Sequence, residues 1–288
     1  MTLTSMTAVI STLSSRLTTF ALVLTIALTT ACSSDPKRDE LTDKEYYEKA
    51  QESMKSNNFQ VASDYLRELE SHYPFGRYAE QAQLELIFAQ FMLSDLEGAL
   101  VSAERFIRLH PLHEQVDYAY YMRGMAAYDL GFGFFERRFP TEQALRDQTA
   151  LKDSFDYFSQ LLNRFPNSIY AADAHQRMIF LRERIAMSEI AIARFNIKRH
   201  AYLAAAKRAQ HVMLHFQGTS MIKDALAIQV EAYELLELPK QRDAALKLLK
   251  LNYPKHEQID DQGNFQVSGL HLEDRRTLFG VLSFGLID

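Results

Sequence analysis

Few residues in this chain of 288 have the type and spacing that catalysis requires. It contains no glycine-rich phosphate loop and no serine set in a nucleophile turn. His211 and His215 lie four residues apart, so on a helix they would share one face and could hold a metal. No glutamate completes the zinc-protease helix motif and no third ligand is evident. We therefore expect no catalytic residue, no metal and no cofactor, and a chain that is not an enzyme.

The only cysteine, Cys32, follows a short apolar run that ends in small residues. This order is typical of a signal peptide, here residues 1–31, and it resembles the cleavage site of bacterial lipoproteins. Thr29 stands where such sites usually have leucine. A transmembrane anchor with an incidental thiol is the alternative, but the run is shorter than the roughly 20 residues that a span needs. We predict that Cys32 carries lipid and that residues 32–41 form a tether.

By the same resemblance, Ser33 after the cysteine indicates the outer membrane, since aspartate there commonly signals retention at the inner membrane. The leader has Arg16 as its only charged residue, so the remaining 257 residues carry 31 basic and 37 acidic side chains. This net charge of −6 disfavours a nucleic-acid-binding protein, which would have a basic face. The mature chain has no second cysteine, so its stability must come from packing.

Helical periodicity dominates from Thr42 to Pro254, and a second, longer period lies above it. Proline closes an amphipathic segment at positions 74, 111, 166 and 254, and Gln217 takes the equivalent place once. Because proline ends a helix, each of these motifs marks the end of a helical hairpin. Small residues such as Ala50, Ala62 and Gly124 fall where the paired helices of a tetratricopeptide unit cross. We predict an all-α, tetratricopeptide-like solenoid of about five helix-turn-helix repeats; an ordinary bundle is the alternative.

Two repeats are longer than the template. About 18 extra residues lie between Gly124 and Ser154, and they include an aromatic segment with Phe132, Phe134, Phe135 and Phe139. That segment is either core filler under a long loop or a binding surface. The first helix of the fourth repeat is expected to run to about Phe195. Residues 255–288 depart from the array, with a loop signal at 260–264 and an apolar end at 277–287 that could be a strand, a helix or a tail.

Four segments resemble signatures of the BamD (ComL-like) family, the lipoprotein component of the outer-membrane β-barrel assembly machine. They are Tyr-Pro-Phe-Gly-Arg-Tyr at 73–78, Phe-Ile-Arg-Leu-His-Pro at 106–111, the tyrosine-rich 117–124, and 165–174. The resemblance implies a membrane-tethered periplasmic scaffold whose N-terminal repeats, 42–166, recognise the C-terminal signal of unfolded outer-membrane proteins. The C-terminal repeats, 167–254, would dock on a periplasmic POTRA domain of the barrel component BamA, beside other Bam lipoproteins.

Candidate residues follow from that resemblance. An extended, aromatic-ended signal suits a groove with exposed aromatic and arginine side chains, for which Tyr73, Phe75, Arg77 and Arg108 are the candidates; packing at helix ends is the alternative. In the family an arginine on the second helix of the fourth repeat pairs with a POTRA carboxylate, and the matching position is Arg208. An intramolecular partner for Arg208 is the alternative. A tetratricopeptide adaptor for cell-envelope division or peptidoglycan machinery would share the solenoid and the anchor, but not the four signatures.

Overall fold

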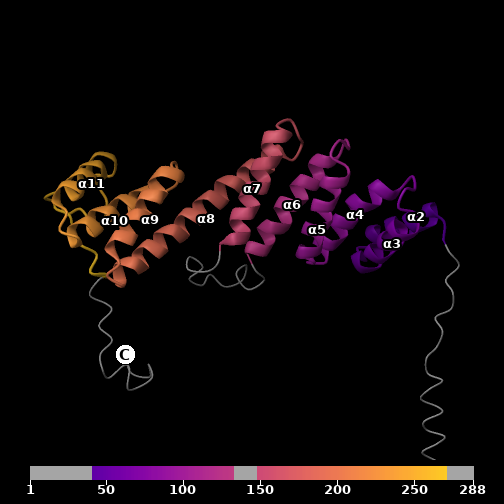
Figure 1. The fold of residues 1–288 in the computed structure, drawn as a ribbon, viewed down its shortest axis with the longest axis horizontal. Helices are drawn as coiled ribbons and strands as arrows, with labels where there is room; N and C mark the ends of the chain where they lie inside the picture. Colours follow the sequence, from indigo (N-terminus) through magenta and orange to yellow (C-terminus); the bar gives the residue numbers. More distant parts are fainter. Residues whose placement is uncertain (1–40, 133–147, 271–288) are drawn as a thin grey trace, which may run out of the picture.

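The computed structural model describes residues 41–132 and 148–270, and its regular elements in these ranges are helical. Within these ranges, ten helices follow one another as five hairpins, which confirms the predicted all-α repeat array. Each helix packs against the next one along the chain, and the hairpins are laid out in sequence order along the long axis (Figure 1). Their bounds are α2 Asp43–Lys55, α3 Phe59–His72, α4 Ala79–Met92, α5 Leu96–Leu109, α6 Val116–Gly131, α7 Thr149–Arg164, α8 Ala171–Lys198, α9 Tyr202–His215, α10 Ile222–Leu235 and α11 Pro239–Asn252.

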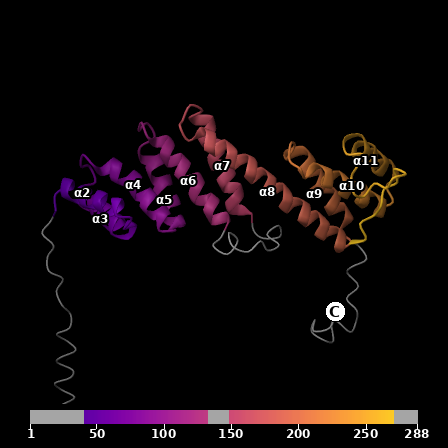
Figure 2. The same ribbon diagram turned by 180° about the vertical axis from the view of Figure 1, so that it is seen from behind.

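The same turn links each hairpin to the next. The residue before each repeat-ending proline is the C-cap of the preceding helix, with φ near −130° at Tyr73, His110, Phe165 and Tyr253. In each of these turns the amide three residues later donates to that C-cap carbonyl, as from Gly76 to Tyr73 at 2.9 Å. Phe216, before Gln217, makes the same bond with Thr219 at 3.2 Å, so this turn survives the loss of proline. The turns after α3, α5 and α7 lie along one long edge of the array (Figure 1), as the view from behind also shows (Figure 2).

Within four of the hairpins, the turn uses a non-glycine residue in the left-handed region. These residues are Asn57, Ser94, His200 and Glu237, with φ between 55° and 61°. The amide after each one bonds back to a carbonyl five residues earlier, as from Asp95 to Gln90 at 2.9 Å, which is a Schellman motif. The third hairpin contains the predicted insertion, of which residues 133–147, with Phe134, Phe135 and Phe139, lie outside the described residues. Phe132 is described, and its ring packs 4.7 Å from Tyr128 and 5.7 Å from Phe180.

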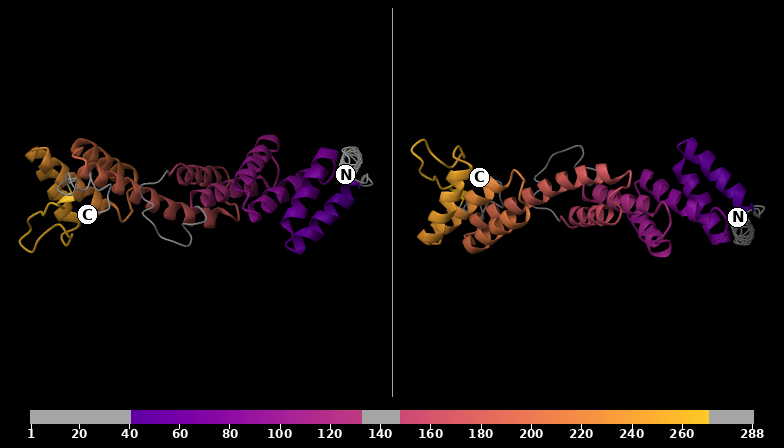
Figure 3. Two further views of the ribbon diagram at one scale, coloured as in Figure 1. Left: turned by 90° about the horizontal axis from the view of Figure 1, so that it is seen from below. Right: turned by 90° about the horizontal axis from the view of Figure 1, so that it is seen from above.

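Helix α8 has 28 residues and runs past the predicted end at Phe195. Its first half, with Leu181, belongs to the large core cluster of α4 to α7, and its second half, with Ile190, belongs to the cluster of α9 and α10. The two halves of the array therefore share one continuous helix rather than a linker. Seen from below and above, the first and last hairpins lie at opposite ends of the array (Figure 3).

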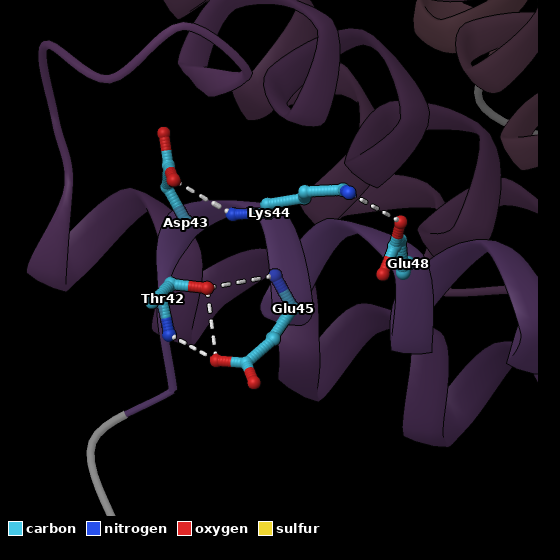
Figure 4. Close-up of polar contacts among 5 residues, drawn as sticks. All are labelled: Thr42, Asp43, Lys44, Glu45 and Glu48. Carbon is cyan, nitrogen blue, oxygen red and sulfur yellow. Dashed lines mark hydrogen bonds and ion pairs between the residues drawn. The ribbon is translucent and has the colours of Figure 1, made fainter.

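The array begins at a capping box directly after the tether. Glu45 donates its amide to the Thr42 hydroxyl, and the Glu45 carboxylate accepts from the Thr42 amide at 2.8 Å (Figure 4). These bonds satisfy amides that the first helical turn would otherwise leave without partners. The hydrogen bond from the Thr42 backbone lowers the pKa of Glu45. The repeat array thus has a defined start at Thr42.

At the other end, residues 255–270 fold back over the last hairpin. The loop signal at 260–264 is a turn, in which Asp260 accepts from the Asn264 amide at 2.6 Å beneath a bridge between Ile259 and Phe265. The buried carboxylate of Glu231 on α10 accepts from Gln258 at 3.3 Å and from Ser268 at 2.5 Å. This segment therefore caps the array, whereas 277–287 lies outside the described residues.

We predict that Gly124→Ala destabilises the protein although alanine favours helix. A Cβ at Gly124 would lie 2.5 Å from a ring carbon of Phe158, which is fully buried. Overpacking costs about 1–3 kcal/mol, against a propensity gain of about 1 kcal/mol. Thermal unfolding should show a lower Tm, and the same substitution in a Phe158→Leu background should cost less. A higher Tm for the single variant would contradict this packing.

Acid should weaken the C-terminal cap through His256. Burial lowers the pKa of this imidazole below its usual 6.5, although Asp224 and Glu257 oppose the effect. The unfolded chain then binds a proton that the folded chain resists, so stability present above about pH 6.5 is lost as the pH falls towards the lowered pKa. Tm should drop more between about pH 7.5 and about pH 5 for the wild type than for His256→Gln. An equal drop in both would exclude this role for His256.

Candidate functional site

A pocket of about 420 Å³ opens on the face made by the first helices of the hairpins. We call it the α4–α6 pocket. The lining side chains come from α2, α4 and the stretches that begin α6 and α8: Met54, Gln81, Leu84, Glu85, Phe88, Gln115, Asp117, Tyr118, Ile169 and Tyr170. The pocket is mainly apolar with few polar groups, which is the composition of a binding site. Residues of four consecutive repeats meet there.

Tyrosines held by carboxylates surround this pocket. Tyr47 donates to Glu85 at 2.8 Å, and Tyr121 donates to Asp173 at 2.8 Å while stacking on Tyr170 with ring centres 4.8 Å apart. Burial raises the pKa of Tyr118, and burial with the bond to Asp173 raises the pKa of Tyr121 to about 12. These phenols are therefore neutral in ordinary buffers. The wall therefore presents aromatic surface and neutral hydroxyl groups that can hydrogen-bond, and these phenols are not ionised near neutral pH.

The four predicted client-binding residues lie at the turns on one edge of the first two repeats. Tyr73 is half-buried, and its hydroxyl donates to the Leu41 carbonyl at 2.9 Å, so the alternative of helix-end packing holds for this side chain. Phe75 is 99% exposed and packs on nothing in the described chain. Arg77 is exposed, with its guanidinium 5.9 Å from the Tyr78 ring centre. Arg108 is exposed in the last turn of α5.

Glu80 brings the two turns together. Its carboxylate lies 3.3 Å from His110 and 3.5 Å from His113, so the start of α4 contacts the turn that follows Arg108. Phe75, Arg77 and Arg108 thus belong to adjacent turns of one edge. That edge continues to Ile169, which lines the α4–α6 pocket and is 84% exposed.

Arg208, the predicted partner-binding residue, has an intramolecular partner. Its guanidinium pairs with Glu189 of α8, whose side chain is only 6% exposed, and the Arg208 side chain is 39% exposed. Lys152 of α7 lies 3.6 Å from the other oxygen of Glu189. Two cations from α7 and α9 therefore neutralise one buried carboxylate. Arg208 lies at the edge of the core, as its helical position predicts, and it keeps an open side towards solvent.

Several of these groups are missing from the sequence-based candidates. Arg123 is buried between the rings of Tyr120 and Tyr157, at 5.0 and 4.2 Å, and burial lowers its pKa. Glu85 and Glu189 stand as single carboxylates within apolar stretches of sequence. Charged residues are rarely buried without a partner. A single carboxylate within an apolar helical stretch is therefore the signal that could have identified Glu85 and Glu189.

The described residues give no third ligand to His211 and His215, whose rings lie 4.5 Å apart. One other group there has the spacing of a metal site: Asp224, His256 and Glu257 place ligand atoms within 4.8 Å of one another. Arg194 already pairs with Asp224. No helix among the described ranges is both long and apolar enough to cross a membrane.

Comparison with known proteins decides the family. The family model described as "YfiO: Outer membrane lipoprotein" matches residues 39–248. The chain belongs to this family. A relative from Vibrio cholerae named "Outer membrane protein assembly factor BamD" is 37% identical over 231 residues, which cover 80% of this chain and 96% of the relative. Relatives of the same name from Neisseria meningitidis serogroup B and Haemophilus influenzae are 36% and 30% identical; the matches cover 73% and 83% of this chain and 78% and 92% of those chains.

Family membership confirms the resemblance seen in the four signatures, and it favours an assembly factor over an adaptor for division or peptidoglycan machinery. The chain is an outer membrane lipoprotein. The match spans nine of the ten described helices and enters the last, so the repeat array itself is the family's shared part.

Proposed function

We propose that this chain is a lipid-anchored, non-enzymatic scaffold of the β-barrel assembly machine. It recognises unfolded outer-membrane proteins with residues 42–166 and docks on the POTRA region of a BamA-type protein with residues 167–254. The observation that carries the proposal is the α4–α6 pocket, an apolar hollow in an extended array, in a family whose relatives are named assembly factors. Repeat solenoids offer such extended surfaces to peptide segments.

Client recognition uses the exposed edge beside the pocket. Phe75 offers a whole aromatic ring to solvent, and Arg77 and Arg108 supply donors that can hold a carboxylate in two-pronged geometry. An extended signal that ends in an aromatic residue has the two groups that these side chains would contact, a ring and a terminal carboxylate. Tyr73 supports the turn from beneath through its bond to Leu41.

Replacing Phe75 and Arg77 together with alanine should lower crosslinking to barrel C-terminal peptides by about fivefold or more, because exposed aromatic and arginine anchors dominate binding energy. Helicity and Tm should stay unchanged, since both side chains are exposed. Lys250→Ala with Leu251→Ala, another exposed cation–apolar pair at the far end of the array, is the matched control. Unchanged crosslinking would place the client site elsewhere.

Docking uses the α9 face around Arg208. A carboxylate from the partner would meet a guanidinium that is already oriented by Glu189 and partly shielded from water. Lys152 remains beside Glu189, so this buried carboxylate keeps a cation when Arg208 also serves the partner. Burying a charge is tolerated only when it stays paired, and this arrangement meets that condition.

Arg208→Glu should reduce co-purification of the BamA-type protein, and a reciprocal charge reversal on the partner should restore it. Removing one member of a desolvated interface pair costs about 2–5 kcal/mol. Lys207→Glu is the control, since Lys207 is exposed and next to Arg208 on α9. Because a new carboxylate would face Glu189, Tm must be recorded for both variants. Wild-type binding by a folded Arg208→Glu protein would contradict this contact.

The anchor places the array at the membrane beside any other Bam lipoproteins. Cys32 lies nine residues before Leu41, so the tether spans at most about 30 Å when extended. Cys32→Ser should abolish lipid labelling and release the protein from membranes unless its partners retain it. An intact mass that shows unmodified Cys32 in the mature wild-type protein would refute lipidation there.

A further inference from the structure

A second pocket, of about 440 Å³, lies between α7, α8 and α9, and none of the roles above uses it. We call it the α7–α9 pocket. Three apolar side chains, Phe155, Ile185 and Phe216, come from three different segments. The other lining side chains are Lys152, Asp156, Arg182, His211 and His215. An apolar pocket with a mainly basic rim selects an occupant that is apolar and acidic at once.

Arg182 has a buried polar atom that lacks a hydrogen-bond partner in the described part of the chain. One guanidinium nitrogen donates to the His215 carbonyl at 3.0 Å, but the Nε atom is buried and has no partner within the described residues. No ion pair joins it to Asp156 in that part of the chain. A carboxylate is the group that best satisfies an arginine, since it can accept two parallel hydrogen bonds.

Lys152 connects this pocket to Arg208. It lines the pocket and also lies 3.6 Å from Glu189, the same buried carboxylate that Arg208 holds. Among the described side chains of the pocket and of the Glu189 cluster, the three cations Lys152, Arg182 and Arg208 outnumber the two carboxylates Glu189 and Asp156, which gives an excess of positive charge next to the proposed docking residue. His211 and His215, both exposed on α9, add further nitrogen groups at the mouth.

We propose that the α7–α9 pocket is a second anchoring point for the docking partner, and that it takes an acidic side chain with an apolar neighbour from that protein. This inference rests on the docking role proposed for repeats 4 and 5. Charge complementarity selects the occupant: a basic or purely apolar segment would leave the Arg182 donor unpaired. With Arg208, the pocket extends the contact surface from α9 across α8 to α7, and so fixes the partner at two points.

The inference is tested by measuring the Kd between the full-length lipidated protein in detergent and the purified POTRA region of the BamA-type protein from the same cells. Arg182→Gln should weaken binding by about tenfold or more. Arg184→Gln is the matched control, because Arg184 lies two residues on along α8 and points to the other side of the helix. It should change the Kd by less than about twofold.

A second pair of variants tests the same pocket if the Arg182→Gln protein does not fold. His211→Glu adds a negative charge at the exposed mouth of the pocket and should weaken binding, whereas Gln210→Glu adds the same charge at the neighbouring exposed position. Weakening by both pocket variants, with both controls near wild type, supports the inference. Wild-type binding by folded pocket variants, with Arg208→Glu impaired, would overturn the pocket's role and leave docking intact.

Wild-type binding by the pocket variants and by Arg208→Glu would overturn both the pocket and the docking proposal. A photoreactive benzoylphenylalanine at position 211 identifies the occupant directly. An adduct with an acidic–apolar segment of the POTRA region supports the inference. An adduct with an unfolded client, or with a second copy of this chain, would overturn it.

Discussion

The whole structure depends on how closely paired helices approach at small side chains. Ala50, Ala62, Ala99 and Ala205 are fully buried on their helices, and Gly124 lies against the ring of Phe158 with no room for a methyl group. Close backbone approach lets each short hairpin bury an apolar stripe that it could not bury alone, so neighbouring hairpins stabilise one another. The turns and pockets are positioned because this stacking repeats. A chain with a single cysteine has no disulfide within itself and obtains its rigidity in this way.

A cluster of charged side chains lies where two of the core clusters meet along the chain. Helix α8 belongs to two core clusters, and the buried Glu189 near its middle is held by Lys152 from α7 and Arg208 from α9. This triad links the third repeat to the fourth. The α4–α6 pocket, by contrast, keeps its tyrosines neutral and its carboxylates hydrogen-bonded. The α4–α6 pocket therefore presents aromatic surface, and the α7–α9 pocket presents a mainly basic rim.

The repeat array was predictable because its signals are local. Proline after each C-cap, small residues at crossings and apolar periodicity all act within one hairpin, and the Phe216 turn shows that the signal survives without proline. The unusual length of α8 could also be predicted, since no proline or glycine interrupts its sequence. Long-range side-chain pairings, such as Glu189 with Arg208 across the α8–α9 hairpin or Glu231 with Ser268 of the C-terminal segment, were not, because they join residues 19 and 37 positions apart whose contact depends on how the elements pack. The exposed candidates Phe75, Arg77 and Arg108 were identified by family resemblance, and only the structure shows that they share an edge with Ile169.

Photocrosslinking in living cells tests the central claim, a division between client-binding and docking repeats, most directly. One probe would replace Leu112, which is 97% exposed at the turn after Arg108, on the same edge as Phe75. The other would replace Ala204, which lies one helical turn before Arg208 on the exposed side of α9. The account predicts adducts with unfolded outer-membrane proteins from position 112 and with the BamA-type barrel protein from position 204. Client adducts at 204 with none at 112, or the same partner at both positions, would contradict it.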